Sequence, residues 1–114
     1  MRDGVMRIRA KIPGVKVIGA TLTSALGSSS AAHGFELQDE KRKKLNDFIR
    51  SSSVFDGVVD FDRATTDTQT GGMKAAFVPD NTVGGLGDKL HPNRLGYQAM
   101  GMAIDLSLFG VPGK

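Results

Sequence analysis

The sequence has no cysteine, which excludes disulfide bonds and cysteine-based metal sites. Histidine is also scarce, because the chain contains only His33 and His91. A zinc site would therefore need several carboxylates as additional ligands. His33 lies in a polar segment, and we expect it to be an exposed loop residue. A substrate contact or a metal ligand is the alternative for it.

Aromatic residues are few: tryptophan is absent, and the chain has six phenylalanines and one tyrosine. The densest basic run, residues 41–44, is therefore not accompanied by the aromatic residues or motifs that are typical of nucleic-acid binding. We interpret this run as the solvated face of a helix. No nucleic-acid partner is expected.

Long apolar segments are missing as well. No stretch approaches the roughly 20 apolar residues that cross a bilayer, so we expect no membrane span. Residues 1–7 are charged and lack the apolar region of a signal peptide. The compartment stays unknown, because a missing N-terminal part would remove any signal that it carried.

The 114 residues allow one domain or part of one. Residues 15–20 form a short β-branched run, typical of a buried parallel strand. Residues 54–61 predict a second strand, or a shorter one at 58–61 after a turn at Asp56-Gly57. Together with the helical segments, these strands indicate an α/β architecture with two parallel strands and two or three helices.

The helical segments are read from apolar periodicity. Residues 2–11 are interpreted as the end of a helix, and residues 36–51 as an amphipathic helix with an apolar stripe. A last helix is predicted from about Asn93 to Phe109, with Gly96 and Gly101 allowing close approach to the sheet. Two stripes are expected to be buried: Leu37, Leu45, Phe48 and Ile49 in the first helix, and Leu95, Ala99, Met102, Ala103 and Leu106 in the last, with Tyr97 packed as well.

Polar segments connect these elements. Residues 21–34 and 63–86 predict loops, and the length of the second favours a functional or mobile role. Asp60 and Asp62 could form a metal-binding pair, but we favour strand-end carboxylates that hold the following loop. Arg50 is interpreted as a partner in a salt bridge at the strand end.

Residues 87–97 carry the strongest functional pattern. Asp88 and His91 are three residues apart, and Pro92-Asn93 signals a helix start immediately after them. On one tight turn, a carboxylate can accept a hydrogen bond from one imidazole nitrogen and leave the other as a general base. A capped helix start with a structural histidine is one alternative. A metal site that includes Asp88 and His91 is another.

The pattern Asp-x-x-His-Pro-Asn-x-x-Gly-Tyr at residues 88–97 resembles the last block of the SGNH (GDSL-type) serine esterases and lipases. Residues 17–23 resemble the fourth core strand of that family and its exit loop, and residues 44–50 and 55–61 fit the next helix and strand. The likeness covers roughly residues 12–109. It implies a three-layer α/β/α sandwich in which Asp88 and His91 belong to a Ser–His–Asp triad, with no cofactor.

The chain also departs from the family pattern. The Gly-Asp-Ser nucleophile block and the blocks with the oxyanion-hole glycine and asparagine are missing. Lys89 stands where a Gly-Asp-Ser reading of residues 87–90 would need serine, and Ser24 stands where many relatives have proline. We therefore expect residues 1–114 to form the C-terminal part of an SGNH domain.

This resemblance implies hydrolysis of a small-molecule ester, such as an acyl lipid, an acetylated sugar or a short-chain ester. A complementing N-terminal half would have to supply the serine. The alternative is a non-catalytic remnant that is stable only as a homo-oligomer, because half a sheet leaves a strand edge uncovered.

Overall fold

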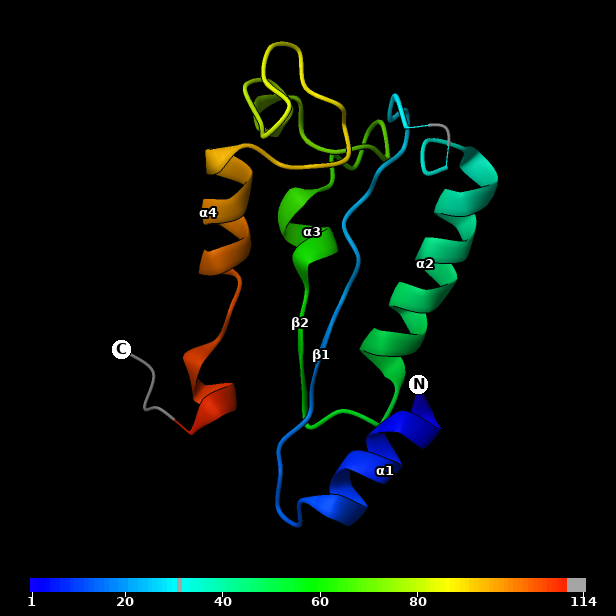
Figure 1. The fold of residues 1–114 in the computed structure, drawn as a ribbon, viewed down its shortest axis with the longest axis vertical. Coiled ribbons are helices and arrows are strands. Elements are labelled where there is room, and N and C mark those ends of the chain that lie inside the picture. Colours follow the sequence, from blue (N-terminus) through cyan, green and yellow to red (C-terminus); the bar gives the residue numbers. More distant parts are fainter. Residues whose placement is uncertain (31, 111–114) are drawn as a thin grey trace.

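The computed structural model describes residues 1–30 and 32–110. Figure 1 shows two strands in the middle, with α2 on one side of them and α4 on the other. The predicted α/β class is confirmed, although the described residues form four α-helices rather than two or three. In chain order, the elements are α1 (Arg2–Lys11), β1 (Ile18–Ala20), α2 (Glu36–Ser51), β2 (Gly57–Val59), α3 (Phe61–Thr65), the 3₁₀ helix η1 (Ala75–Phe77), α4 (Arg94–Met102) and the 3₁₀ helix η2 (Leu106–Phe109).

The strands β1 and β2 pair in parallel, with Ile18 opposite Gly57. The predicted parallel arrangement is therefore right, but both strands are shorter than expected. β2 ends at Val59 because Asp60 caps α3, where its carboxylate accepts a hydrogen bond from the backbone N–H of Arg63 at 3.1 Å. That cap starts α3 inside the segment that was predicted to be strand.

Helix α2 has the predicted bounds, but polar side chains occupy much of its inner face. Asn46 and Asp39 are buried there together with Ile49. Leu37 was expected in the buried stripe, yet 66% of it is exposed. The inner face of α2 is therefore held by hydrogen bonds and ion pairs as well as by apolar packing.

Helix α4 ends at Met102 instead of continuing to Phe109. Gly101 in its last turn weakens the helix, and the Asp105 carboxylate then caps η2 by accepting from the Ser107 N–H at 2.9 Å. The expected burial of its apolar stripe is also wrong, because Leu95, Tyr97, Met102 and Leu106 are all about half exposed or more. Within the described residues, α4 packs mainly against α3 and η1, and its face with Leu95, Tyr97 and Met102 stays exposed.

The predicted loops are only partly irregular. Residues 63–86 include the end of α3, an isolated antiparallel bridge between Thr66 and Met73, and η1. The described part of residues 21–34 forms no regular element, as expected. None of the described helices combines the length and apolar character that a bilayer crossing requires.

Asp60 makes the fold sensitive to acid. The Arg50 guanidinium, with the Arg63 N–H and the Thr21 hydroxyl, lowers the pKa of Asp60 from 3.8 to about 2. The ionised form therefore stabilises the fold above pH 3.8, and this contribution disappears as the pH falls toward about 2. We expect a loss of about 1–2 kcal/mol in this window.

The measurement is urea unfolding at several pH values for the wild type and Asp60→Asn. The pH dependence should be weaker in the variant across that window. Asp47→Asn, which removes a carboxylate that is 77% exposed, should keep the wild-type dependence. Equal pH dependence in all three proteins would contradict the role of Asp60.

Candidate active site

Asp88 and His91 lie on one tight turn directly before α4, as their spacing predicts. His91 Nδ1 is 2.7 Å from Asp88 Oδ2. An ionised carboxylate can only accept, so the imidazole donates from Nδ1 and its Nε2 carries no proton in the neutral ring. The His91 side chain is 48% exposed and that of Asp88 is 14% exposed. The turn therefore presents a fixed imidazole whose second nitrogen is accessible.

The Asp88 carboxylate also builds the turn that carries it. Its Oδ1 accepts from the backbone N–H groups of His91 at 2.9 Å and Leu90 at 3.0 Å. The His91 N–H, the His91 ring, the Leu90 N–H and the Asn81 amide together hold the pKa of Asp88 well below its ordinary range. Asp88 is therefore ionised at neutral pH and suited to stabilise a protonated imidazole.

Asn81 is a site residue that sequence reasoning missed. It is buried, and its amide nitrogen donates to Asp88 Oδ1 at 2.9 Å and to the His91 carbonyl at 2.8 Å. Its oxygen accepts from the Val83 N–H at 3.0 Å. Asn81 thus connects both ends of the Asp88–His91 turn to the preceding loop. Its distance of seven residues from Asp88 gave no periodic signal in the sequence.

The start of α4 fixes the turn from its other side. Asn93 caps the helix by accepting from the Gly96 N–H at 3.2 Å, and its amide donates to the carbonyls of Ala76 and Pro79, both at 2.9 Å. Pro92 directly precedes this cap, in agreement with the helix start predicted at Pro92-Asn93. The Asn93 side chain therefore joins α4 to the η1 segment.

Two glycines behave differently from expectation. Gly96 is buried in a close approach, since a Cβ there would lie 2.6 Å from Pro92 Cβ, but it faces η1 and Pro92 rather than the sheet. Gly101 faces open space and permits no close contact. Gly87 has φ +76°, and a Cβ on it would lie within 2.0 Å of the Val78 carbonyl oxygen. Only glycine fits at position 87, directly before Asp88.

Replacing Asn81 with alanine should lower the free energy of unfolding by about 1–3 kcal/mol, because it removes three hydrogen bonds at a buried position. It should also accelerate hydrogen exchange at the Leu90 and His91 amides. Urea unfolding and amide exchange measured by NMR test both effects. Thr82→Ala is the control, since Thr82 is an exposed neighbour. Equal behaviour of the two variants would mean that Asn81 does not hold the turn.

A second polar cluster lies where the strands end and joins them to α2. Arg42 Nε donates to Asp39 Oδ1 at 2.7 Å, and its Nη1 pairs with Asp62 Oδ1. Arg50 binds Asp60 through Nε at 2.8 Å and Asp62 through Nη2 at 2.7 Å. The hydrogen bonds from Arg50, Thr66 and Arg42 outweigh burial and lower the pKa of Asp62 below its ordinary value.

Three predictions from the sequence concern residues of this cluster. Arg50 forms the predicted salt bridges, and Asp60 and Asp62 hold the strand end as favoured. The interpretation of residues 41–44 as a solvated face is wrong for Arg42, whose side chain is only 10% exposed. Among residues 1–30 and 32–110, no three histidine or carboxylate side chains converge as a metal site would require, either here or around His91.

The loop after β1 connects this cluster to the Asp88 turn. Asn46 holds its start by accepting from the Leu22 N–H at 2.8 Å and donating to the Leu22 carbonyl at 2.9 Å. Farther along the loop, the Ser29 N–H donates to the Asp88 carbonyl at 3.3 Å. His33 in this loop is exposed, as expected. In the described residues, no hydroxyl forms a hydrogen bond with His91 Nε2.

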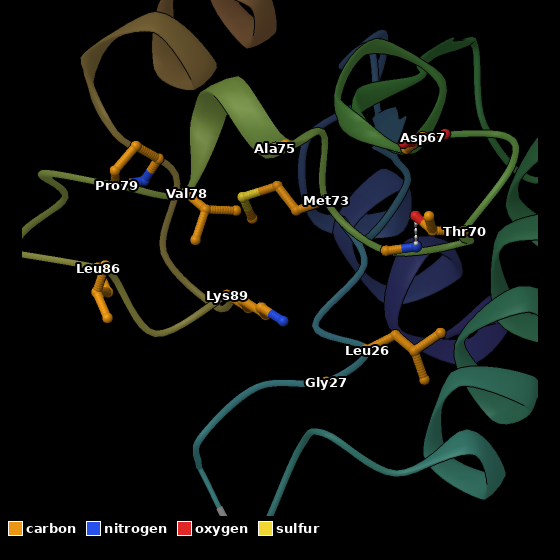
Figure 2. Close-up of a pocket in the computed structure, with 11 residues that line it drawn as sticks. Leu26, Gly27, Asp67, Thr70, Met73, Ala75, Val78, Pro79, Leu86 and Lys89 are labelled. Atoms are coloured by element: carbon orange, nitrogen blue, oxygen red, sulfur yellow. Dashed lines mark hydrogen bonds between the residues drawn. The ribbon is translucent and has the colours of Figure 1, made fainter.

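A cavity of about 440 Å³ lies next to the turn (Figure 2). Its walls are largely apolar and include Leu26, Met73, Val78 and Leu86, and Lys89 extends into it from the Asp88–His91 turn. The sequence did not predict this cavity, since its lining comes from three separate segments.

Comparison of the chain with protein-family models and with curated proteins gives no match.

Proposed function

We propose that this chain contributes the acid and base of an SGNH-type serine ester hydrolase. The supporting observation is the 2.7 Å hydrogen bond between His91 Nδ1 and Asp88 Oδ2, which leaves Nε2 accessible. The block of residues 88–97 that resembles that family supports the assignment independently of the geometry. Asn81 and Asn93 keep the pair in place, as a site that must not move during a reaction requires.

In this mechanism, His91 Nε2 accepts the proton of a serine hydroxyl while the hydroxyl oxygen attacks the ester carbonyl carbon. The imidazolium then returns the proton to the leaving alcohol. Asp88 orients the ring through Nδ1 and stabilises the imidazolium. The serine and the oxyanion donors come from a segment outside residues 1–114. The substrate is a carboxylic ester, and the reaction needs no cofactor.

The proposal assigns β1 and β2 to a larger parallel sheet in a three-layer α/β/α sandwich. Open apolar surface supports this assignment: Leu95 is 56% exposed, Met102 is 80% exposed and Leu106 is 52% exposed. Covering these side chains would contribute about 25 cal/mol for each Å² of apolar area removed from water. A complementing segment that adds strands and helices would provide that cover.

A second candidate is a non-catalytic oligomer of this chain. The same exposed side chains favour it, because another copy could cover them. In that case, Asp88 and His91 would have only the structural role of starting α4. The two candidates differ in whether a serine nucleophile meets His91.

Two measurements test the proposal. The first is the sequence of the reading frame upstream of Met1, and the second is hydrolysis of a short-chain nitrophenyl ester by the protein that this reading frame encodes. We expect a Gly-Asp-Ser segment upstream and turnover by the longer protein, but none by residues 1–114 alone. The folded 114-residue chain could instead hydrolyse the ester by itself and lose this activity in His91→Ala. That result would contradict a serine nucleophile from outside residues 1–114. A reading frame without that segment, and an inactive oligomeric chain, would favour the non-catalytic candidate.

A further inference from the structure

The cavity next to the Asp88–His91 turn has the size and lining of a ligand site. Its volume of about 440 Å³ falls within the range of about 300–1,000 Å³ that small-molecule pockets occupy. Met73 and Val78 are buried at its wall, whereas Leu86 on its rim is 92% exposed. Leu86 therefore adds exposed apolar surface at the edge of the cavity, where an apolar group can lie against it.

Among the described residues, Lys89 is the one cation in the lining of the cavity. Figure 2 shows its side chain between Val78 and Met73 on one side and Leu26 and Gly27 on the other. The backbone of Lys89 has φ +55°, so this residue adopts the left-handed conformation on the turn. No carboxylate of residues 1–30 and 32–110 forms an ion pair with it.

Asp67 is the one acidic residue among the lining residues that the structure describes. Figure 2 shows it beside Thr70, at the end of the cavity away from Leu86. Its Oδ1 accepts from the Gln69 N–H at 2.8 Å, which belongs to a local turn. The Asp67 carboxylate is held in this local turn and forms no ion pair with Lys89, so the positive charge of Lys89 is available to a ligand.

We propose that this cavity binds a linear aliphatic carboxylate of medium chain length. The hydrocarbon chain lies against Leu26, Met73, Val78 and Leu86, and the carboxylate pairs with Lys89 Nζ. The inference goes beyond ester hydrolysis, since binding of such an anion needs neither His91 nor a nucleophile. The apolar walls disfavour a small, strongly hydrated anion, and the lysine disfavours an aliphatic amine.

The experiment is isothermal titration calorimetry of the chain with octanoate, hexanoate and butyrate, and with octanol as the uncharged counterpart. Octanoate should bind saturably at one site, and each added methylene should tighten binding about threefold. Lys89→Gln should weaken octanoate binding about fivefold, as an exposed ion pair allows, and leave octanol binding within about twofold. Lys89→Arg should restore octanoate binding.

Matched variants separate the cavity from general surface effects. Lys44→Gln removes an exposed lysine of α2 and should leave octanoate binding unchanged. Leu86→Ser should weaken both octanoate and octanol, whereas Val83→Ser, in the same loop and 63% exposed, should weaken neither. Leu86 and Val83 are both exposed, so neither substitution should unfold the chain.

Two results would overturn the proposal. One is absence of saturable octanoate binding by the folded chain. The other is equal weakening by Lys89→Gln and Lys44→Gln. His91→Ala distinguishes this inference from the hydrolase function. The variant removes the proposed base but no residue of the cavity lining, so octanoate binding should persist whether or not the protein hydrolyses esters.

Discussion

Replacing Arg42 with alanine should lower the free energy of unfolding by about 3 kcal/mol, the lower end of the range for removing one partner of a buried ion pair, because Asp39 keeps Lys43 and Asp62 keeps Arg50. Arg42 is 10% exposed and pairs with Asp39, which is 3% exposed, and with Asp62, which is 13% exposed. It also donates to the Leu22 carbonyl at 3.0 Å. Without the guanidinium, the buried Asp39 and the partly buried Asp62 each lose one cationic partner, and the loop after β1 loses a tether to α2.

Urea unfolding followed by circular dichroism measures this effect. Lys44→Ala is the matched control on the same helix and should change stability by less than about 0.5 kcal/mol. Because so small a fold has little stability to lose, Arg42→Lys provides a milder second variant that keeps the charge but loses the paired geometry. Equal stability of Arg42→Ala and Lys44→Ala would mean that the cluster does not hold the strand ends.

Under the proposed function, ester hydrolysis by the longer protein should fall by about 10⁴-fold or more when His91 is replaced by alanine. The imidazole is the only base held by Asp88, and triad members act as a unit, so its loss removes almost all nucleophilic catalysis. The fall should appear in kcat and in kcat/KM alike, because the proposed mechanism uses His91 in the transition state and not in substrate binding.

The chain offers a matched control for this prediction. His33 is the only other histidine, and it is exposed in the loop after β1. His33→Ala should keep kcat within about twofold, because His33 is exposed and its removal leaves the Asp88–His91 hydrogen bond intact. Asp88→Asn should lower kcat by about 10³–10⁴-fold through the wrong imidazole tautomer. Retained activity in His91→Ala would remove this residue from the mechanism.

Local patterns predicted the parts of this molecule that depend on neighbours in the sequence. The bounds of α2 follow from the amphipathic spacing of residues 36–51, and the Asp88–His91 hydrogen bond follows from a spacing of three residues. Periodicity could not predict that Leu95 and Met102 would be exposed. Their burial depends on which partner lies opposite, and the described residues provide none.

The features that were missed arise from tertiary contacts. Asn81 looks like an ordinary loop residue until its amide is seen to contact both Asp88 and His91. Arg42 belongs to a basic run by sequence, but the fold places two aspartates against it. The cavity beside Lys89 needs three separate segments to come together, and no one-dimensional pattern records that arrangement.

The most direct test of the Asp88–His91 pair is the ¹⁵N NMR spectrum of the His91 imidazole in the purified chain, at a pH where the ring is neutral. We expect a protonated Nδ1 and an unprotonated Nε2, because the ionised Asp88 carboxylate accepts from Nδ1. Asp88→Asn should remove this preference. A wild-type ring protonated at Nε2 would contradict the account, since Asp88 would then not hold His91 as an available base.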